Sequence, residues 1–521
     1  MNNILEMLEE SAKRFGDKIA FSDPDREISF GNLLKKSQEV GAWFIKEGLI
    51  DPAERDNSVL FYMEKCVAAL PVMFGGVYCN AFYAFLDIRQ TKERALNIIE
   101  TVSPNVIITD KDNVDRLKEY MGDAFCSSEN HVILIEELLI NASAAAADDA
   151  ADDALLLSKA QKTFYSLSPL YVNFTSGSTG TPKGVAVGHA SVIDFISVFT
   201  KTFGINKQDI IANQAPFDFD VSVKDIYSGL YTGAKVVIIP RSYFSNPTLL
   251  MDYLCDNKVT TLIWAVTAMC FVSTMNGFGY RNPDTITQVM FSGELMPIKQ
   301  LNKWKKYQPH ARYVNLYGPT EITCNCTYHI LDREYDNQEI LPIGIPFDNE
   351  KVFLLDEEDK VINKPDKEGE ICVAGECLAL GYYKNPEKTA ESFTLNPANA
   401  CLPERIYKTG DLGKYDDAGL LYYTSRKDFQ IKHMGQRIEL GDIESAAGSL
   451  DGVERAVCLY DHAHKKIILV YTGGCEKDSL SQSLRDKLPA FMIPGKTVKM
   501  DSLPVNKNGK VDRKQLEAEV M

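Results

Sequence analysis

Short runs of β-branched and aliphatic residues alternate along the chain with longer stretches in which apolar residues recur at helical spacing. The short runs predict strands at Asn105–Thr109, Val236–Pro240, Thr261–Val266, Val289–Phe291 and Tyr313–Leu316. Amphipathic segments lie between them and predict helices, for example at Thr248–Asn257 and Ile298–Tyr307. Such alternation is typical of βαβ units, so we expect parallel sheets covered by helices.

The pattern changes after about Gly369, where shorter apolar runs are separated by glycine and aspartate. Strands are predicted at Glu370–Val373, Leu420–Tyr423, Ala456–Leu459 and Ile467–Tyr471. The last two strands belong to a stretch that is typical of a smaller α/β unit. We therefore expect two domains, a large one over residues 1–425 and a small one over residues 426–521.

One segment before the second half of the chain has an unusual composition. Residues Asn141–Leu157 are mostly alanine and aspartate. A segment of this kind has few large apolar side chains to bury, so it predicts a surface loop or a solvated helix, with no function implied.

Composition and charge exclude several classes of function. Hydrophobic residues make up 45% and charged residues 25% of the chain, an ordinary globular balance. The net charge of −16 makes nucleic acid and anionic membranes poor partners. No apolar run reaches the ~18 residues that span a bilayer, and the first residues lack a signal-peptide pattern. The twelve cysteines are scattered without a CxxC pair, so we expect reduced thiols in a cytoplasmic protein.

A glycine-rich loop is the strongest local signal. From Thr175 to Gly184 the chain has three glycines, five hydroxyl residues and one lysine, after a strand-like apolar run that begins at Tyr171. Glycines let a backbone approach a ligand closely, and N–H groups, hydroxyls and Lys183 would bind phosphate oxygens. The lysine is followed by Gly184 where a Walker loop has serine or threonine, so this is a different kind of phosphate loop.

This loop resembles the phosphate-binding loop of the adenylate-forming superfamily, and other motifs of that superfamily follow in the same order. They are Phe217–Ser222, Asn315–Glu321, Tyr407–Asp411, Arg426–Glu444, Leu488–Pro494 and Asn508–Arg513. Within the superfamily the chain is similar to amino-acid adenylation enzymes, namely adenylation domains of nonribosomal peptide synthetases and stand-alone D-alanine–carrier-protein ligases.

The resemblance implies a multidomain α/β fold. Its large N-terminal domain would hold two mostly parallel, helix-covered sheets and a small distorted β-barrel, and its small α+β C-terminal domain would be mobile. The implied reaction joins an amino acid to the α-phosphate of ATP with Mg²⁺, releases pyrophosphate, and passes the aminoacyl group to the phosphopantetheine thiol of a carrier protein. Because the chain ends eight residues after Arg513 with no carrier signature, we expect a separate carrier protein.

Matching to the superfamily motifs assigns roles to individual residues. Lys510 would contact the substrate carboxylate and the α-phosphate, Lys183 and Thr320 would assist catalysis, and Glu321 would hold Mg²⁺. Rotation at a hinge, Asp428, would exchange the faces of the small domain between the two half-reactions. The other nucleotide contacts implied by the resemblance are Thr175, Ser176, Gly177, Ser178, Thr179, Gly180, Gly293, Glu294, Asn315, Tyr317, Asp411 and Arg426.

The resemblance also implies an acyl pocket. Asp220 would pair with the α-ammonium of an amino acid, which simple-acid ligases do not need; the alternative is a helix N-cap. The other positions are Val221, Lys224, Trp264, Met290, Ser292, Leu316, Cys324 and Asn325. Lysine is rarely buried unpaired, so we expect Lys224 to point outward, whereas an inward Lys224 would favour a polar or acidic substrate. Cys324 is expected to pack, not to act as a nucleophile.

The substrate stays open among alanine, serine and an acidic amino acid. Ser292 stands where D-alanine ligases tend to have cysteine, which weakens that assignment. Two other hypotheses are an acyl-CoA ligase for a small carboxylic acid and a family member that has lost its activity and serves as a scaffold. Asp220 argues against the first, and the set Lys183, Glu321, Asp411 and Lys510 argues against the second.

Overall fold

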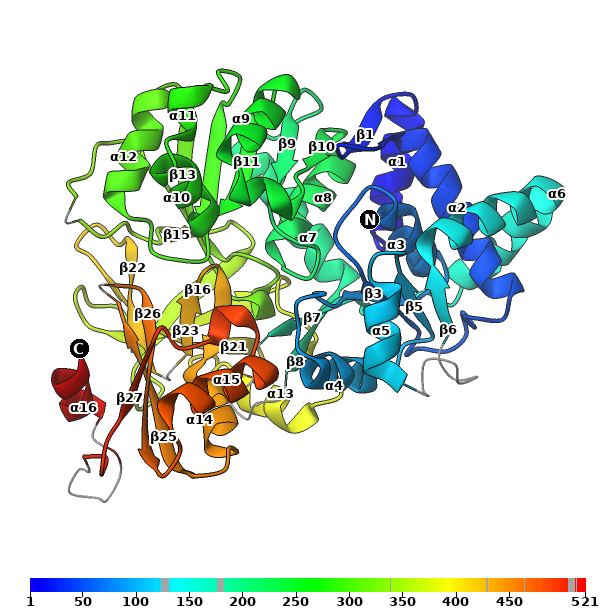
Figure 1. Ribbon diagram of the computed structural model, residues 1–521. Helices are drawn as coiled ribbons and strands as arrows, with labels where there is room; N and C mark the ends of the chain where they lie inside the picture. Colours follow the sequence, from blue (N-terminus) through cyan, green and yellow to red (C-terminus); the bar gives the residue numbers. More distant parts are fainter. Residues whose placement is uncertain are drawn as a thin grey trace. The chain divides into compact units, whose positions relative to one another are not determined.

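The computed structural model describes residues 1–122, 131–175, 182–337, 339–427, 430–462, 464–504, 511 and 513–521, without the side chains of 148–150 and 514. These residues form two compact units. The first comprises Met1–Ile88, Val102–Asn173 and Gly184–Lys427, and the second comprises Arg89–Thr101, Phe174–Lys183 and Asp428–Met521. Figure 1 shows the elements of both units.

The first unit is built on a sheet of nine strands. Its six central strands run parallel, and antiparallel strands lie at both edges. In spatial order the strands are β15 (Ile345–Pro346), β14 (Thr327–Ile330), β13 (Arg312–Tyr317), β12 (Gln288–Ser292), β11 (Thr261–Ala265), β9 (Ile210–Asn213), β10 (Lys235–Ile238), β1 (Ile19–Ser22) and β2 (Glu27–Ser29).

A second sheet has seven strands, of which five run parallel. Its order is β19 (Gly381–Tyr382), β8 (Lys183–Gly188), β7 (Pro169–Thr175), β4 (Phe82–Phe85), β3 (Ser58–Tyr62), β5 (Val106–Thr109) and β6 (His131–Leu134). A third, antiparallel sheet of six strands stands where the small barrel is expected. Its strands are β17 (Val361–Ile362), β16 (Glu350–Leu355), β18 (Gly369–Gly375), β21 (Arg405–Tyr415), β20 (Phe393–Leu395) and β22 (Leu421–Arg426).

Helices cover both faces of the nine-stranded sheet, as parallel strands require. On one face Trp264 and Phe291 pack into a buried cluster with Leu250, Met269 and Trp304, which come from α9 (Pro247–Asp256), α10 (Val266–Thr274) and α12 (Ile298–Tyr307). The opposite face packs against α7 (His189–Phe203) and α8 (Val221–Thr232) in a larger cluster shared with the seven-stranded sheet. Figure 1 shows this layering in its upper half.

The remaining helices of the first unit are α1 (Leu5–Phe15), α2 (Phe30–Lys46), α3 (Ala69–Tyr78), α5 (Val114–Met121), α6 (Ile135–Gln161), α11 (Gly277–Tyr280) and α13 (Pro386–Ser392). Helices α2 and α3 pack closely because Gly75 has no side chain: a Cβ there would lie 2.5 Å from Val40 Cγ1. The alanine- and aspartate-rich segment belongs to α6, which buries Ala142 and Leu157 and pairs Asp153 with Lys46 of α2. The segment is therefore a helix with one packed stripe, and is less solvated than its composition predicts.

The second unit contains a hairpin, β23 (Gln430–His433) and β24 (Gln436–Glu439), and a three-stranded sheet. That sheet holds β25 (Val453–Asp461), β26 (Lys466–Gly473) and β27 (Lys496–Lys499). Helices α14 (Leu440–Gly448), α15 (Lys477–Lys487) and α16 (Arg513–Val520) contribute to its two buried clusters, and α4 (Lys92–Val102) is grouped with it.

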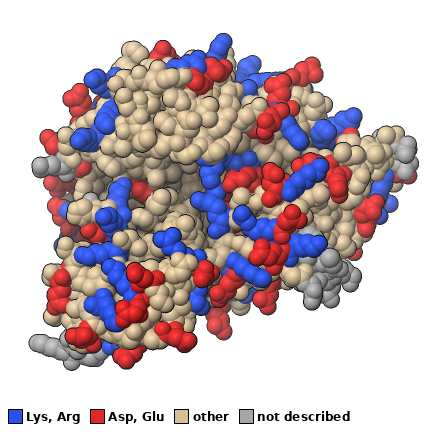
Figure 2. Space-filling view, viewed as in Figure 1, with Lys and Arg blue, Asp and Glu red and all other residues tan. Residues whose placement is uncertain are grey.

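The mixed α/β class predicted from the sequence is confirmed, and the predicted strands lie within one or two residues of β5, β10, β11, β12 and β13. Among the described residues, no helix is long and apolar enough to cross a membrane. On the face seen in Figure 2, basic and acidic side chains are interspersed.

Candidate active site

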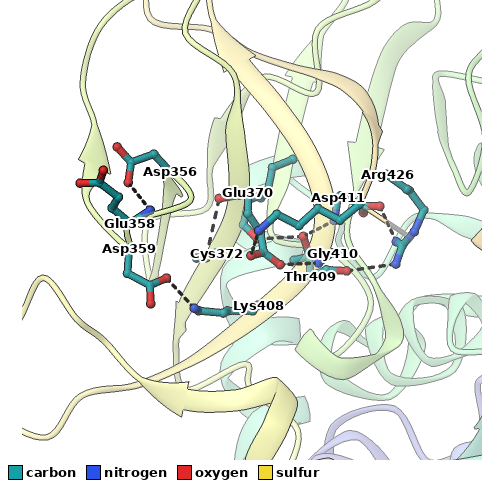
Figure 3. A network of polar contacts seen from close by, with 12 residues as sticks. Asp356, Glu358, Asp359, Glu370, Cys372, Lys408, Thr409, Gly410, Asp411 and Arg426 are labelled. Carbon is teal, nitrogen blue, oxygen red and sulfur yellow. Dashed lines mark hydrogen bonds and ion pairs between the residues drawn. The ribbon is translucent and has the colours of Figure 1, made fainter. Parts of the chain in front are cut away.

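Three predicted nucleotide-binding residues lie together in the first unit. Asp411 of β21 is paired across the sheet with Arg426 of β22, and Tyr317 ends β13. The Tyr317 hydroxyl donates to Asp411 Oδ2 at 2.6 Å, while the Arg426 guanidinium donates to Asp411 Oδ1. Asp411 is 2% exposed and Tyr317 6%. Figure 3 shows Arg426 and Asp411 facing each other. A buried carboxylate is thus held from both sides by donors.

A short backbone turn positions Asp411. Thr409 Oγ1 accepts from the Asp411 N–H at 3.0 Å and donates to the Ile371 carbonyl at 2.8 Å. The N–H of Gly410 donates to Glu370 Oε1 at 3.0 Å, and Gly410 has a φ of 73°, a conformation that favours glycine. These contacts fix the carboxylate before any ligand arrives. Figure 3 shows Glu370, Thr409, Gly410 and Asp411 of this turn.

Burial determines the protonation state of the phenol. Burial first, and then the charge of Asp411, raise the pKa of Tyr317 well above its usual value. Tyr317 therefore keeps its proton at neutral pH and remains a hydrogen-bond donor to Asp411. The carboxylate keeps further lone pairs, which hydroxyl donors of a ligand would use.

Glu321 lies in a 3-10 turn, η3 (Thr320–Ile322), that follows β13. Glu321 is only 1% exposed, and its Oε1 accepts a hydrogen bond from the Tyr382 hydroxyl at 2.8 Å. Thr320 is buried beside it. Magnesium takes one or two protein carboxylates and completes its shell with water and substrate phosphates. A single buried carboxylate that is fixed by a phenol fits this requirement.

Three other predicted nucleotide contacts lie within β13 or directly after β12. Asn315 of β13 donates from Nδ2 to the Pro342 carbonyl at 2.8 Å, which orients its amide so that Oδ1 is the remaining acceptor. Gly293 follows β12 directly and has a φ of 99°, in the region that favours glycine. Glu294 Oε1 accepts from Thr267 Oγ1 at 3.0 Å.

Asp220 stands at the start of α8, but it does not cap the helix. It is 6% exposed, and its side chain makes no capping hydrogen bond to the first turn. Ser222 does not cap the helix either, since its hydroxyl donates back to the Phe219 carbonyl at 2.8 Å. The N-cap interpretation of Asp220 is therefore wrong.

The expectation that Lys224 points outward is also wrong. Its side chain is fully buried, and Nζ donates to Asn325 Oδ1 at 2.6 Å. Burial lowers the pKa of Lys224, and the nearby charges of Asp220 and Asp225 oppose that shift. The sequence rule failed because it assumes an unpaired lysine, whereas the amide of Asn325 supplies an acceptor in the interior.

The structure separates Trp264 from the other predicted pocket residues. In the parallel register of β11 and β12, Ile263 pairs with Met290 and Trp264 pairs with Phe291. Successive side chains of a strand point to opposite faces, so Trp264 lies on the face opposite Met290. Its indole donates to the Ala212 carbonyl at 2.9 Å and packs near Trp304. The pocket position assigned to Trp264 therefore belongs to its neighbour Ile263, which pairs with Met290.

Three other predicted pocket residues share the large buried cluster or its face of the sheet, and a fourth lies in α8. Met290 and Leu316 belong to that cluster, and Ser292 lies two residues beyond Met290 on the same face. Val221 begins α8 and is 4% exposed.

The segment after η3 is pressed against the start of α8. The Cys324 thiol donates to the Asp220 carbonyl at 3.0 Å, and burial raises the pKa of Cys324 well above its usual value. Cys324 is therefore a packed, protonated thiol, as predicted. Gly318 lets the same segment lie close to the end of β13, because a Cβ at Gly318 would lie 2.5 Å from Asn325 Cα.

Several predicted residues cannot be placed. Ser176, Gly177, Ser178, Thr179, Gly180, Asp428 and Lys510 lie outside the described residues. Thr175 is the last residue of β7. Lys183 begins β8, and within the second unit its Nζ lies 3.9 Å from Glu439 Oε1.

Sequence reasoning missed three contributors. Tyr382, which donates to Glu321, lies sixty-one positions further along the chain, and nothing in its local sequence marks it. Ile263 and Ala265 face the same side as Met290 and Ser292. Strict two-residue alternation, counted back from a residue already placed, would have found both of the latter.

The AMP-binding enzyme family matches residues 8–383. The chain is 30% identical to tyrocidine synthase 1 of Brevibacillus parabrevis over 525 residues, covering 99% of this chain and 45% of that protein. It is 29% identical to the D-alanine–D-alanyl carrier protein ligase of Bacillus cytotoxicus, covering 99% of each. The chain thus spans less than half of one relative and nearly all of the other.

Among solved structures, the Vibrio cholerae adenylation domain AlmE in complex with glycyl-adenosine-5'-phosphate superposes with a TM-score of 0.82. The match covers 99% of this chain and 98% of that one at 18% identity. At this identity the likeness shows a shared adenylation-domain fold and nothing finer.

Proposed function

Because the chain belongs to the AMP-binding enzyme family, we propose that it activates an amino acid with ATP and loads it onto a separate carrier protein. In the first step an oxygen of the amino-acid carboxylate bonds to the α-phosphorus of ATP, and the bond to the β-phosphate oxygen breaks. Pyrophosphate leaves and an aminoacyl-AMP remains. In the second step a phosphopantetheine thiol loses its proton to solvent, its sulfur bonds to the acyl carbon, and AMP leaves. The setting proposed is the cytoplasm, where ATP is available.

Asp411 is proposed to bind the two ribose hydroxyls of ATP. Its carboxylate is acceptor-only, and its orientation is fixed by Tyr317 and Arg426 before a ligand is present. Tyr317 would lay its ring against adenine while its hydroxyl stays on Asp411. Asn315 Oδ1 is oriented to accept from the adenine amino group, because the amide nitrogen is already held by Pro342.

Glu321 is proposed to hold Mg²⁺ together with the phosphates of ATP. When bound, the ion would neutralise negative charge that builds up as pyrophosphate leaves. The Tyr382 hydroxyl keeps the Glu321 carboxylate in place. Lys183, Thr320 and the loop residues from Thr175 to Gly180 would contact the phosphates, in line with their match to the family motif.

The burial of Asp220 is the observation that carries the amino-acid assignment. The Asp220 carboxylate is 6% exposed, does not cap α8 and stands one helical turn before the buried Lys224. A carboxylate has several lone pairs and can accept from more than one cationic group. The α-ammonium of an amino acid would supply a cation at this position. A ligase for simple carboxylic acids gains nothing from such a charge.

The C-terminal part of the chain is proposed to supply the moving groups. Lys510 would meet the substrate carboxylate and the α-phosphate during adenylation, and rotation at Asp428 would then replace it for the thiol step. Both residues carry these roles on their match to the family motifs alone, as does the proposed boundary between domains at residues 425 and 426.

Pyrophosphate exchange into ATP tests the proposal. The purified protein is incubated with labelled pyrophosphate, ATP, Mg²⁺ and each proteinogenic amino acid or D-alanine, with simple carboxylic acids as a parallel set. Exchange with at least one amino acid is expected, and Asp220→Asn should abolish it. Exchange with simple acids only, together with thioester formation on free coenzyme A, would show an acyl-CoA ligase.

A further inference from the structure

Two buried lysines in the first unit differ in how completely their ammonium groups are satisfied. Lys65 Nζ donates to four acceptors, namely the carbonyls of Asn213, Gln214 and Ala215 and the side chain of Asn213, at 2.7 to 3.1 Å. An ammonium has three N–H donors, so the protein supplies more acceptors than Lys65 can use. Lys65 is therefore a structural cation, complete without a ligand.

Lys224 is more deeply buried than Lys65 but has far fewer partners. Within the described ranges its Nζ meets a single hydrogen-bond acceptor, Asn325 Oδ1, at 2.6 Å. Two of its three N–H donors are thus left over in a fully buried side chain. An incompletely satisfied buried charge costs stability unless something else completes it.

The position of Lys224 places this incomplete cation in the acyl site. Lys224 follows Asp220 by four residues at the start of α8, so the two side chains share one face of that helix. Its partner Asn325 follows Cys324, whose thiol donates to the Asp220 carbonyl at 3.0 Å. The ammonium therefore lies close to the carboxylate that is proposed to bind the substrate amine.

Four ionisable side chains are buried here, Asp220, Lys224, Lys65 and Asp225, and their formal charges sum to zero. Lys224 lies within electrostatic range of both Asp220 and Asp225. Lys65 is matched by Asp225, and Asn213 bridges that pair by accepting from Lys65 and donating to Asp225 Oδ2, both at 2.8 Å. If a proton moves from Lys65 to Asp225, both side chains become neutral and their summed charge is still zero. The α-ammonium of a bound amino acid would add one positive charge that these residues do not offset.

We propose that the amino acid carries a side-chain carboxylate, and that Lys224, held in place by Asn325, binds it. This inference rests on the proposed function. The carboxylate would accept the two remaining N–H donors of Lys224 and would restore charge balance after the α-ammonium enters beside Asp220. Aspartate- or glutamate-like amino acids meet both conditions. Alanine meets neither condition, whereas serine, asparagine and glutamine can accept a hydrogen bond from Lys224 but leave the added positive charge unbalanced.

Exchange of pyrophosphate into ATP with paired substrates tests the inference in the full-length protein. The pairs are aspartate with asparagine and glutamate with glutamine, each as both enantiomers, plus alanine. An acidic amino acid is expected to exceed its own amide in kcat/KM by about 100-fold, the size expected for a charge-assisted pair in a buried site. A preference for alanine or for an amide would overturn the inference while leaving amino-acid activation standing. Exchange with no amino acid would overturn both.

Substitution of the lysine then tests the residue. Lys224→Met keeps the length of the side chain and removes the charge, so the preference for the acid over the amide should fall to within about 3-fold. The matched control is Lys303→Met, because Lys303 Nζ donates to the Ser273 carbonyl at 3.0 Å and lies outside the site. Calorimetric measurement of ATP binding reports whether each variant is folded. A folded Lys224→Met variant with an unchanged acid preference would overturn the assignment, and the wild-type panel decides the substrate class even if this variant does not fold.

Discussion

The hydroxyl of Tyr317 donates to Asp411 Oδ2 at 2.6 Å, which joins the end of β13 to the antiparallel sheet that carries β21. The two residues are ninety-four positions apart in sequence. Their contact is buried, and it sets the direction in which the Asp411 carboxylate presents its remaining lone pairs.

Tyr317→Phe removes this hydrogen bond and keeps the ring. The KM for ATP should rise by about 5- to 10-fold, as expected for the loss of one bond to a charged group, while kcat changes by less than about 2-fold. Steady-state kinetics at saturating amino acid measure both. Tyr313→Phe is the control, since the Tyr313 hydroxyl, also buried on β13, donates only to the Gln308 carbonyl at 3.0 Å. An equal effect of both variants would show general damage to the strand.

Glu321→Gln preserves shape and removes the charge proposed to hold Mg²⁺. The Mg²⁺ concentration that gives half-maximal exchange should rise by about 10-fold or more. Titration of Mg²⁺ at fixed ATP measures it. Glu350→Gln is a matched control, because Glu350 is also a buried glutamate and burial raises its pKa well above its usual value. If both variants keep the wild-type Mg²⁺ requirement, Glu321 is not the ligand.

Gly318→Ala should displace the segment that brings Cys324 and Asn325 to the acyl site. The new Cβ would meet Asn325 Cα at 2.5 Å and the Cys324 carbonyl at 2.7 Å, so this segment must shift. We expect a loss of about 1–3 kcal/mol in the free energy of unfolding and a raised KM for the amino acid. Gly448→Ala is the control, because a Cβ there meets nothing within 4 Å. Wild-type kinetics in a folded Gly318→Ala variant would contradict the close packing described.

Stability should fall in mild acid because of His189. This side chain is 3% exposed, its Nδ1 accepts from the Ile4 N–H, and burial lowers the pKa of His189 from 6.5 to about 3. The unfolded chain therefore binds a proton that the folded protein does not bind, so the free energy of unfolding decreases as the pH falls below 6.5. By about pH 5 this costs about 2 kcal/mol.

Urea unfolding near neutral pH and near pH 5 measures this effect. The free energy of unfolding of His189→Asn should fall by about 2 kcal/mol less than that of the wild type over this interval. His310→Asn, at an exposed position, should follow the wild type. The same pH dependence in all three proteins would assign the acid sensitivity to other groups.

The sequence predicts elements and motif positions well but side-chain direction less well. Alternating apolar runs sufficed to locate β11, β12 and β13, because buried parallel strands need continuous apolar residues. Trp264 lies on the wrong face for the pocket, because a shift of one residue along a strand moves every side chain to the opposite face of the sheet. The pairing of Ile263 with Met290 reveals this shift. Motif matching alone does not contain that pairing.

Contacts between distant segments were the other limit. Lys224 was expected in solvent because its acceptor, Asn325, lies one hundred and one positions away. Likewise, Tyr382 meets Glu321 only after β19 and η3 are brought together in the fold. Burial of a polar group depends on such partners, and composition within a local window does not predict them.

Transfer of oxygen from substrate to AMP tests the central claim most directly. The protein is incubated with ATP, Mg²⁺, carrier protein and an amino acid whose α-carboxylate is labelled with oxygen-18, and the released AMP is analysed by mass spectrometry. Attack of the carboxylate on the α-phosphorus predicts that one labelled oxygen appears in the phosphate of each AMP formed. Unlabelled AMP, or release of ADP with label in inorganic phosphate, would contradict the account.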